Sequence, residues 1–143
     1  MLDINVEDYL AKGRNALIRK IVQKSDCAGN YSNSLHEVMS TLACIDMAIK
    51  ASVEAVDKHL PEGYATVGRQ ICFTHDAPSS IDMTVNVRAT LVEISGRILM
   101  FDIKAWDEMG DVGHGYYERV VVKQNEVLQK SRERAKFLQQ RTF

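Results

Sequence analysis

Hydrophobic residues recur with a helical period in one stretch of the chain, residues 35–60. At about 100° per residue they fall along one side of a helix, with charged residues gathered away from that side. Ser34 followed by Glu37 is typical of a capping box, and Pro61-Glu62-Gly63 is typical of a helix end. The pattern predicts one long helix, whose apolar side consists of Val38, Leu42, Ile45, Ile49, Val53, Val56 and Leu60.

Five other segments alternate hydrophobic and polar residues, which indicates strands. One precedes the helix and four follow it, at residues 15–22, 66–74, 83–94, 97–106 and 112–122. Ser95-Gly96 and the segment 108–111 are typical of hairpin turns, and such short connections join antiparallel neighbours. Residues 25–34 are rich in turn formers and are expected to form a loop, which could act as a lid. The tail, residues 124–141, is polar and helix-prone.

These elements predict an α+β domain in which an antiparallel sheet of about five strands buries one face against the long helix. The sequence shows no internal repeat, and its two prolines, Pro61 and Pro78, define no linker. Residues 1–143 are therefore expected to form a single domain, which is long enough to bury a substantial core.

Composition narrows the classes of partner. Hydrophobic residues make up 45% of the chain and charged residues 26%, and the net charge is −1. That charge gives no reason to expect nucleic acid or an anionic membrane as a partner. No segment approaches the roughly 20 apolar residues of a membrane span. The scattered cysteines, Cys27, Cys44 and Cys72, suggest no disulfide framework, and a reducing cytoplasm is the expected location.

Three segments carry a resemblance to a known family. They are Val38-Met39-Ser40-Thr41, then Gly68 followed by Ile71-Cys72-Phe73-Thr74-His75, and Gly113-His114-Gly115-Tyr116-Tyr117-Glu118-Arg119. In this order and spacing they resemble the fluoroacetyl-CoA thioesterases, which have the hot-dog fold. The resemblance implies a sheet wrapped around one long central helix, with a C-terminal helix. It also implies a homodimer that binds acyl-CoA at the subunit interface and needs no cofactor beyond the CoA of its substrate.

The same resemblance implies a set of site residues. The family's helix threonine corresponds to Thr41, its strand-end histidine to His75 and its last-strand arginine to Arg119. Gly68 corresponds to a glycine whose backbone lies close to the thioester. The family's helix acid, eight residues after the threonine, is replaced by Ile49 in this chain.

Each candidate side chain also has its own chemistry. An imidazole accepts a proton at neutral pH, so His75 suits a general base, although a structural histidine is the alternative. Arg119 could bind a carboxylate or phosphate, or form a structural ion pair. His114 lies between two glycines, which suits the wall of a substrate site or a sheet edge. Asp76 is expected to point away from His75, because neighbouring strand residues face opposite sides.

Two functions remain open at this point. The first is an acyl-CoA thioesterase, in which His75 activates water or the hydroxyl of Thr41. The second is a non-catalytic module that binds acyl-CoA or another small ligand, which the replacement of the acid by Ile49 favours. A metal site is not expected, because Cys72 and His75 fall on opposite faces of a strand. Cys44 is expected to be a small buried residue rather than a nucleophile.

Overall fold

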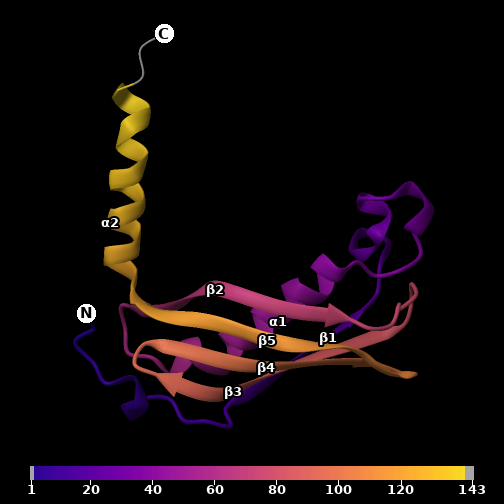
Figure 1. Cartoon of the computed structure of the whole chain (residues 1–143), viewed down its shortest axis with the longest axis horizontal. Coiled ribbons are helices and arrows are strands. Elements are labelled where there is room, and N and C mark those ends of the chain that lie inside the picture. The colour runs from indigo at the N-terminus through magenta and orange to yellow at the C-terminus, as the bar shows by residue number, and fades with distance from the viewer. Residues whose placement is uncertain (1, 141–143) are drawn as a thin grey trace.

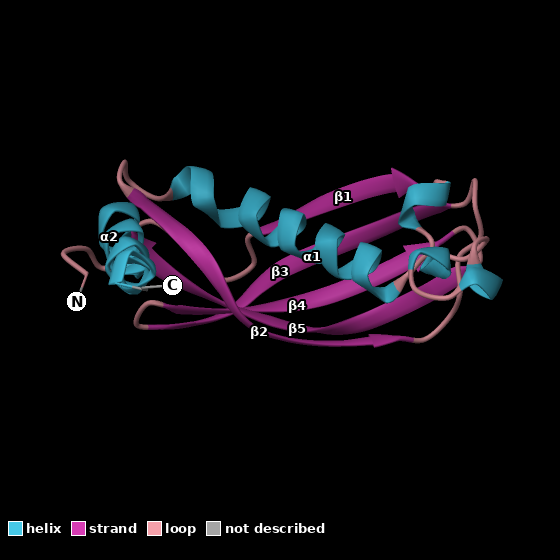
Figure 2. Ribbon diagram, turned by 90° about the horizontal axis from the view of Figure 1, so that it is seen from above, coloured by secondary structure: helices cyan, strands magenta, loops and turns pink. Residues whose placement is uncertain are grey.

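The computed structural model describes residues 2–140 and contains one antiparallel sheet with the strand order β1-β3-β4-β5-β2 (Figures 1 and 2). Each predicted strand is present, with ends within two residues of those expected. Gly96 and Gly110 have positive φ angles of 60° and 123° in the two hairpin turns, a conformation that glycine adopts without strain. The strands are β1 (Asn15–Ile21), β2 (Tyr64–His75), β3 (Thr84–Ser95), β4 (Ile98–Asp107) and β5 (Gly110–Lys123).

The long helix α1 spans Thr41–Val56, so the predicted start near residue 35 and the predicted N-cap at Ser34 are wrong. Val38 and Met39 instead form isolated antiparallel bridges with Ser80 and Cys27. Those bridges engage the backbone of this segment and keep it out of the helix. Ser40 is the N-cap, and its side-chain oxygen accepts the N–H of Ala43 at 3.0 Å.

The face of α1 that packs on the sheet also differs from the predicted one. Figure 2 shows α1 lying lengthwise over one face of the sheet, and it contacts mainly β1 and β3. Small residues let the helix approach the strands closely, whereas Leu42 and Ile49 of the predicted apolar side remain 57% and 36% exposed. The buried residues of α1 are Cys44, Met47, Ala48, Ala51, Ser52, Ala55 and Val56.

The core lies between α1 and the inner face of the sheet. Alternate residues of the central strand β4 and of its neighbour β3 are buried there, as strand geometry requires. On β3 these residues are Val85, Val87, Ala89 and Leu91, and on β4 they are Leu99, Phe101, Ile103 and Ala105.

Strand β2 lies at one edge of the sheet and pairs only with β5 among residues 2–140. The register shifts between Gly68 and Gln70, so Arg69 is an extra residue in a β-bulge. A bulge reverses the alternation of side chains along a strand. Val67 therefore faces the opposite side of the sheet from His75, although unbroken alternation would place both side chains on the same side.

After β5 the chain enters helix α2 (Gln124–Ala135), which stands away from the sheet and confirms the helical character expected for the tail (Figure 1). Residue 141, the last of the predicted tail, lies outside the described residues. The predicted loop 25–34 is present and contains short 3₁₀ turns, in agreement with its content of turn formers. Within residues 2–140, no helix combines the length and apolar character needed to cross a membrane.

Candidate active site

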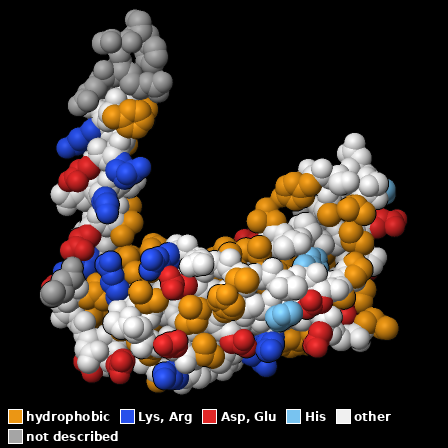
Figure 3. All heavy atoms as spheres, viewed as in Figure 1, with side chains coloured by type: hydrophobic (Ala, Val, Ile, Leu, Met, Phe, Trp, Pro, Cys, Tyr) orange, Lys and Arg blue, Asp and Glu red, His pale blue; other side chains and the backbone are white. Residues whose placement is uncertain are grey.

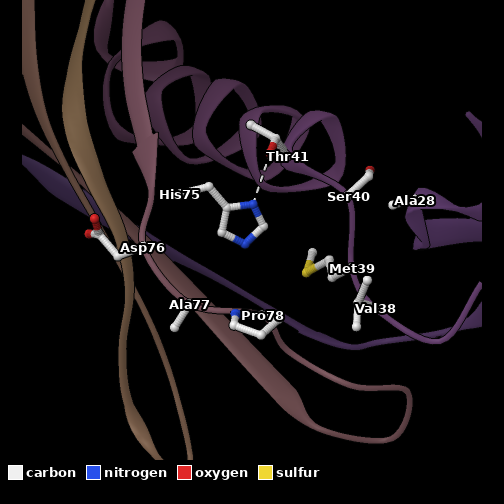
Figure 4. Close-up of a pocket in the computed structure, with 9 residues that line it drawn as sticks. All are labelled: Ala28, Val38, Met39, Ser40, Thr41, His75, Asp76, Ala77 and Pro78. Carbon is white, nitrogen blue, oxygen red and sulfur yellow. Dashed lines mark hydrogen bonds between the residues drawn. The ribbon is translucent and has the colours of Figure 1, made fainter. Parts of the chain in front are cut away.

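A cavity of about 320 Å³ opens where α1 begins and β2 ends (Figure 4). The bridge between Val38 and Ser80 brings the segment before α1 next to the segment after β2. The bridge between Met39 and Cys27 adds the segment that contains Ala28. The cavity therefore combines residues that are far apart in the sequence. Its lining residues are Ala28, Val38, Met39, Ser40, Thr41, His75, Asp76, Ala77 and Pro78.

Two of the predicted site residues, Thr41 and His75, contact each other in this cavity. Thr41 Oγ1 lies 2.9 Å from Nδ1 of His75 (Figure 4). Thr41 is the first residue of α1 and His75 is the last residue of β2, so the ends of two regular elements position the pair. The first N–H groups of a helix have no intrahelical partner and carry partial positive charge. Thr41 therefore lies where an anionic oxygen would be stabilised.

The second ring nitrogen of His75, Nε2, is buried and has no hydrogen-bond partner among residues 2–140. Figure 4 shows this nitrogen on the side of the ring that faces Met39 and Pro78. In a neutral imidazole one nitrogen donates and the other accepts. If Nδ1–H donates to Thr41, then Nε2 is an acceptor; if the Thr41 hydroxyl donates to Nδ1, then Nε2 carries the proton. Nε2 can thus accept a proton from a bound molecule in the first tautomer and donate a proton to it in the second.

His114 does not line this cavity. Its Nδ1 lies 2.7 Å from a carboxylate oxygen of Asp76, and both side chains are substantially exposed. The carboxylate of Asp76 points away from His75 (Figure 4), as the alternation of the strand predicts. The carboxylate of Asp76 therefore orients His114, and the side-chain partner of His75 is Thr41.

Arg119 lies in a buried hydrogen-bond network on β2 and β5, with 5% of its surface exposed. Its Nε donates to Thr66 Oγ1 at 2.8 Å, its Nη2 to the Thr66 carbonyl at 2.7 Å, and its Nη1 to the Tyr117 hydroxyl at 2.6 Å. Thr66 Oγ1 in turn donates to Asp57 at 2.6 Å. The guanidinium therefore holds β2 in place beside Gly68, which lies opposite Arg119 in the pairing of β2 with β5.

Gly68 has no room for a side chain. A Cβ atom there would lie 2.1 Å from the Tyr117 hydroxyl oxygen. Tyr117 was not among the predicted site residues, although its position two residues before Arg119 places both on the same strand face. The requirement for glycine at position 68 thus comes from Tyr117.

Within one chain, Gly68 and Arg119 are far from Thr41 and His75. Gly68 pairs with Arg119, whereas His75 pairs with Gly113 at the other end of the same ladder. At about 3.3 Å per residue this separation is on the order of 20 Å. The structure thus divides the predicted residues into two groups, and only Thr41 and His75 share a cavity.

Ile49, at the position of the family's helix acid, lines a second cavity of about 340 Å³. The acidic side chain nearest to it in sequence, Asp46, also lines this cavity but is paired with Lys50 at 2.8 Å. Ile49 therefore contributes an apolar wall, and Asp46 is neutralised by its neighbour on the helix.

Cys44 is fully buried on α1, and its thiol lies 3.9 Å from the sulfur of Met39. Burial raises the pKa of the Cys44 thiol to about 11, which disfavours the thiolate needed in a nucleophile. Cys44 thus has the properties of a core residue.

The sequence model of the fluoroacetyl-CoA-specific thioesterases matches residues 22–125, which is well over half of the chain. The chain belongs to this family. The matched residues of this member of the fluoroacetyl-CoA-specific thioesterase family include Thr41, Gly68, His75 and Arg119. They leave out β1 and nearly all of α2.

Individual members and solved structures agree with this assignment. The fluoroacetyl-CoA thioesterase of Streptantibioticus cattleyicolor is 34% identical over 86 residues, which span 60% of this chain and 62% of that relative. A hot-dog-like protein from Thermanaerovibrio acidaminovorans is 30% identical, with a TM-score of 0.87 over 92% of this chain and 97% of that one. A solved structure of the fluoroacetyl-CoA thioesterase is 26% identical, with a TM-score of 0.78 over 87% and 96%. The predicted hot-dog fold is confirmed.

Proposed function

We propose that the protein is an acyl-CoA thioesterase that hydrolyses a small acyl-CoA thioester to the free acid and CoA. The observation that carries this proposal is the Thr41–His75 pair, whose buried Nε2 lacks a partner among residues 2–140. The adjoining cavity, at about 320 Å³, is at the small end of ligand sites, which suits a short acyl group.

His75 can act in two ways, which differ in the position of its proton. With Nδ1–H donating to Thr41, Nε2 removes a proton from water as the water oxygen attacks the thioester carbonyl. With Nδ1 as the acceptor, the Thr41 oxygen attacks instead and forms an acyl-enzyme that water then hydrolyses. In both routes the C–S bond breaks, and the imidazolium returns its proton to the sulfur of CoA.

The negative charge on the carbonyl oxygen needs hydrogen-bond donors. Stabilisation of such an oxyanion is usually the largest single contribution to acyl transfer. The N–H groups at the start of α1 are close to Thr41, and the backbone N–H groups near Gly68 supply further donors when a second subunit is present. Arg119 holds the Gly68 segment in place through Thr66 and Tyr117 and is thus a positioning residue.

A homodimer formed through β2 would unite the two separated groups of residues. β2 is an edge strand, and the exposed apolar residues Leu42, Ile49 and Val67 lie on β2 or α1. A two-fold axis through Cys72 pairs Gly68 of one subunit with His75 of the other, because Arg69 is the extra residue of the bulge and takes no place in the register. Residues directly opposite in an antiparallel pair share a face. Gly68 lies beside the inward Tyr117 and His75 reaches the inward Thr41, so this register brings both to one site.

A cytoplasmic location also fits this function. The three cysteines are free thiols, as expected in a reducing compartment. We place no nucleic acid or membrane among the partners, which are the acyl-CoA substrate and a second copy of the chain.

The test is the release of CoA thiol from a panel of short, branched and aromatic acyl-CoA esters. His75→Ala should lower kcat at least ~10²-fold, in line with the contribution of a general base. His36→Ala removes an exposed histidine outside the cavity and should leave kcat unchanged. Hydrolysis that survives in His75→Ala would contradict the mechanism. Binding of CoA esters without hydrolysis of any of them would replace the proposal with a non-catalytic binding module.

A further inference from the structure

A basic groove lies between the base of α2 and the strands β2 and β5, with a volume of about 390 Å³. Figure 3 shows blue basic side chains gathered at the base of α2, next to hydrophobic ones. The floor and walls include Val67, Val120, Val122 and Val127. Cations around the groove are Arg69, Arg97, Lys123 and Lys130, against a single acidic lining residue, Glu126.

Some of these cations already form ion pairs with acidic side chains, and others do not. Lys123 pairs with Asp3 and lies 3.8 Å from Glu126, and Arg69 lies 3.3 Å from Glu118. Arg97 and Lys130 form no ion pair with any side chain of residues 2–140. A local excess of positive charge in a chain with a net charge of −1 points to an anionic ligand.

We propose that this groove binds the nucleotide half of acyl-CoA, with Arg97 and Lys130 on its phosphates and the valines against the adenine ring. The inference rests on the proposed function. Arginine and lysine bind phosphate through charge-assisted hydrogen bonds, and an apolar wall accommodates a purine. The nucleotide of CoA needs both kinds of contact, whereas an inorganic anion uses only the charges.

The position of the groove relative to the reaction site supports this ligand. Gly68 and Arg69 line the groove, and the proposed two-fold axis places Gly68 opposite His75 of the partner subunit. The groove lies on the face of the sheet opposite to His75, and His75 is the last residue of β2. An acyl-CoA whose thioester lies at His75 of one subunit would then pass the end of that β2 beside Gly68 of the partner and enter the partner's groove. Val127 and Lys130 of the groove lie outside the residues matched by the family, so this half of the groove is a feature of α2.

Direct binding of CoA tests the groove without requiring catalysis. In titration calorimetry, the double variant Arg97→Gln/Lys130→Gln should bind CoA at least ~10-fold more weakly than the unaltered protein. Affinity of the unaltered protein should fall with ionic strength, since these charges are exposed, and the variant should show a shallower salt dependence. Lys104→Gln removes an exposed cation of β4 outside the groove and should leave CoA affinity unchanged.

Competition experiments identify the bound group. Adenosine 3′,5′-bisphosphate should displace CoA from the unaltered protein at concentrations where inorganic phosphate does not. Equal displacement of CoA by the bisphosphate and by inorganic phosphate would show that the groove binds anions without selecting the nucleotide. Equal CoA affinity in the double variant and in Lys104→Gln would overturn the proposal, and circular dichroism with the two single variants excludes a folding defect.

Kinetics separates this proposal from the proposed function. For an acyl-CoA ester, the double variant should raise KM about tenfold or more with kcat unchanged. For the matching acyl-pantetheine ester, which lacks the nucleotide, the variant and the unaltered protein should have the same KM. A rise in KM for both esters would contradict the groove. Loss of CoA affinity in a protein that hydrolyses neither ester would support the groove and contradict the thioesterase.

Discussion

The Thr41 hydroxyl and the His75 imidazole lie 2.9 Å apart although the two residues are 34 positions apart in the chain. We expect Thr41→Ala to lower kcat between ~10-fold and ~10²-fold, because it removes either the nucleophile or the group that sets the tautomer of His75. Thr41→Ser keeps the hydroxyl and should retain most activity. The neighbouring Thr74 faces the other side of β2, so Thr74→Ala is the matched control.

Mass spectrometry distinguishes the two roles of Thr41. Under rapid quenching, an acyl adduct on the peptide that contains Thr41 would establish the covalent route. Absence of the adduct, together with a reduced kcat in Thr41→Ala, would favour direct attack by water. An unchanged kcat in Thr41→Ala would remove this hydroxyl from both routes.

The next residue in the chain, Leu42, allows a test of how two subunits associate. Its side chain is 57% exposed and follows Thr41, which contacts the edge strand β2 through His75, so a partner subunit paired through β2 would cover it. Leu42→Asp should convert the proposed dimer to a monomer in analytical ultracentrifugation and abolish most activity. An acid in the first turn of a helix is favourable, so the substitution should not weaken α1 itself.

The other edge of the sheet provides the control for assembly. Leu17 on β1 is 37% exposed, and Leu17→Asp should leave the proposed dimer intact. Dissociation by Leu17→Asp but not by Leu42→Asp would move the interface to β1 and refute the pairing through β2.

Ile49→Glu tests whether the missing acid limits the reaction. Restoring a carboxylate two helical turns after Thr41 should raise kcat on short acyl-CoA esters by about tenfold, since acid–base groups contribute ~10² or more when positioned. Ile49→Gln has the same shape without the charge and should not raise kcat. Equal losses in both variants would indicate that the apolar wall itself is required.

Local patterns predicted the strands well and the helix only in part. Each strand alternates over its own length and ends at a turn, so its limits depend on nearby residues. The start of α1 depends on bridges from Val38 and Met39 to residues 80 and 27, which no local pattern reveals. The buried face of α1 was missed because its alanines pack closer to the sheet than the larger Leu42 and Ile49 could.

The candidate site could likewise be predicted only in part, because some of its geometry depends on residues that are distant in the sequence. Pairing of Thr41 with His75 requires the tertiary fold, and only the resemblance to a known family placed the two residues together in advance. The bulge at Arg69 reverses the strand alternation, so the face of Val67 could not be predicted by counting along β2. Tyr117, by contrast, could have been found, because it shares a strand face with Arg119.

Gly68→Ala should destabilise the protein by about 1–3 kcal/mol, the usual cost of overpacking. The new Cβ would lie 2.1 Å from the Tyr117 hydroxyl oxygen, which Arg119 holds at 2.6 Å. Tyr117→Phe removes that oxygen and should recover part of the loss in the Gly68→Ala background. A double-mutant cycle by urea unfolding measures this coupling, and strictly additive effects would contradict the steric explanation.

Burial of Cys44 predicts a dependence of stability on pH. Its pKa is raised from 9.0 to about 11 in the folded protein. Above pH 9 the unfolded chain therefore loses this proton while the folded chain keeps it, so the contribution is complete below pH 9 and is lost as the pH rises. By pH 10 the loss amounts to roughly 1 kcal/mol.

Cys44→Ala isolates this contribution, since every other titrating group remains in the variant. The free energy of unfolding, measured in urea at pH 8 and pH 10, should fall by about 1 kcal/mol more in the unaltered protein than in Cys44→Ala. Parallel losses in the two proteins would show that the Cys44 thiol ionises equally easily in both states. Because the thiol packs under Met39 at the wall of the cavity, that result would also place water in the core beneath the site.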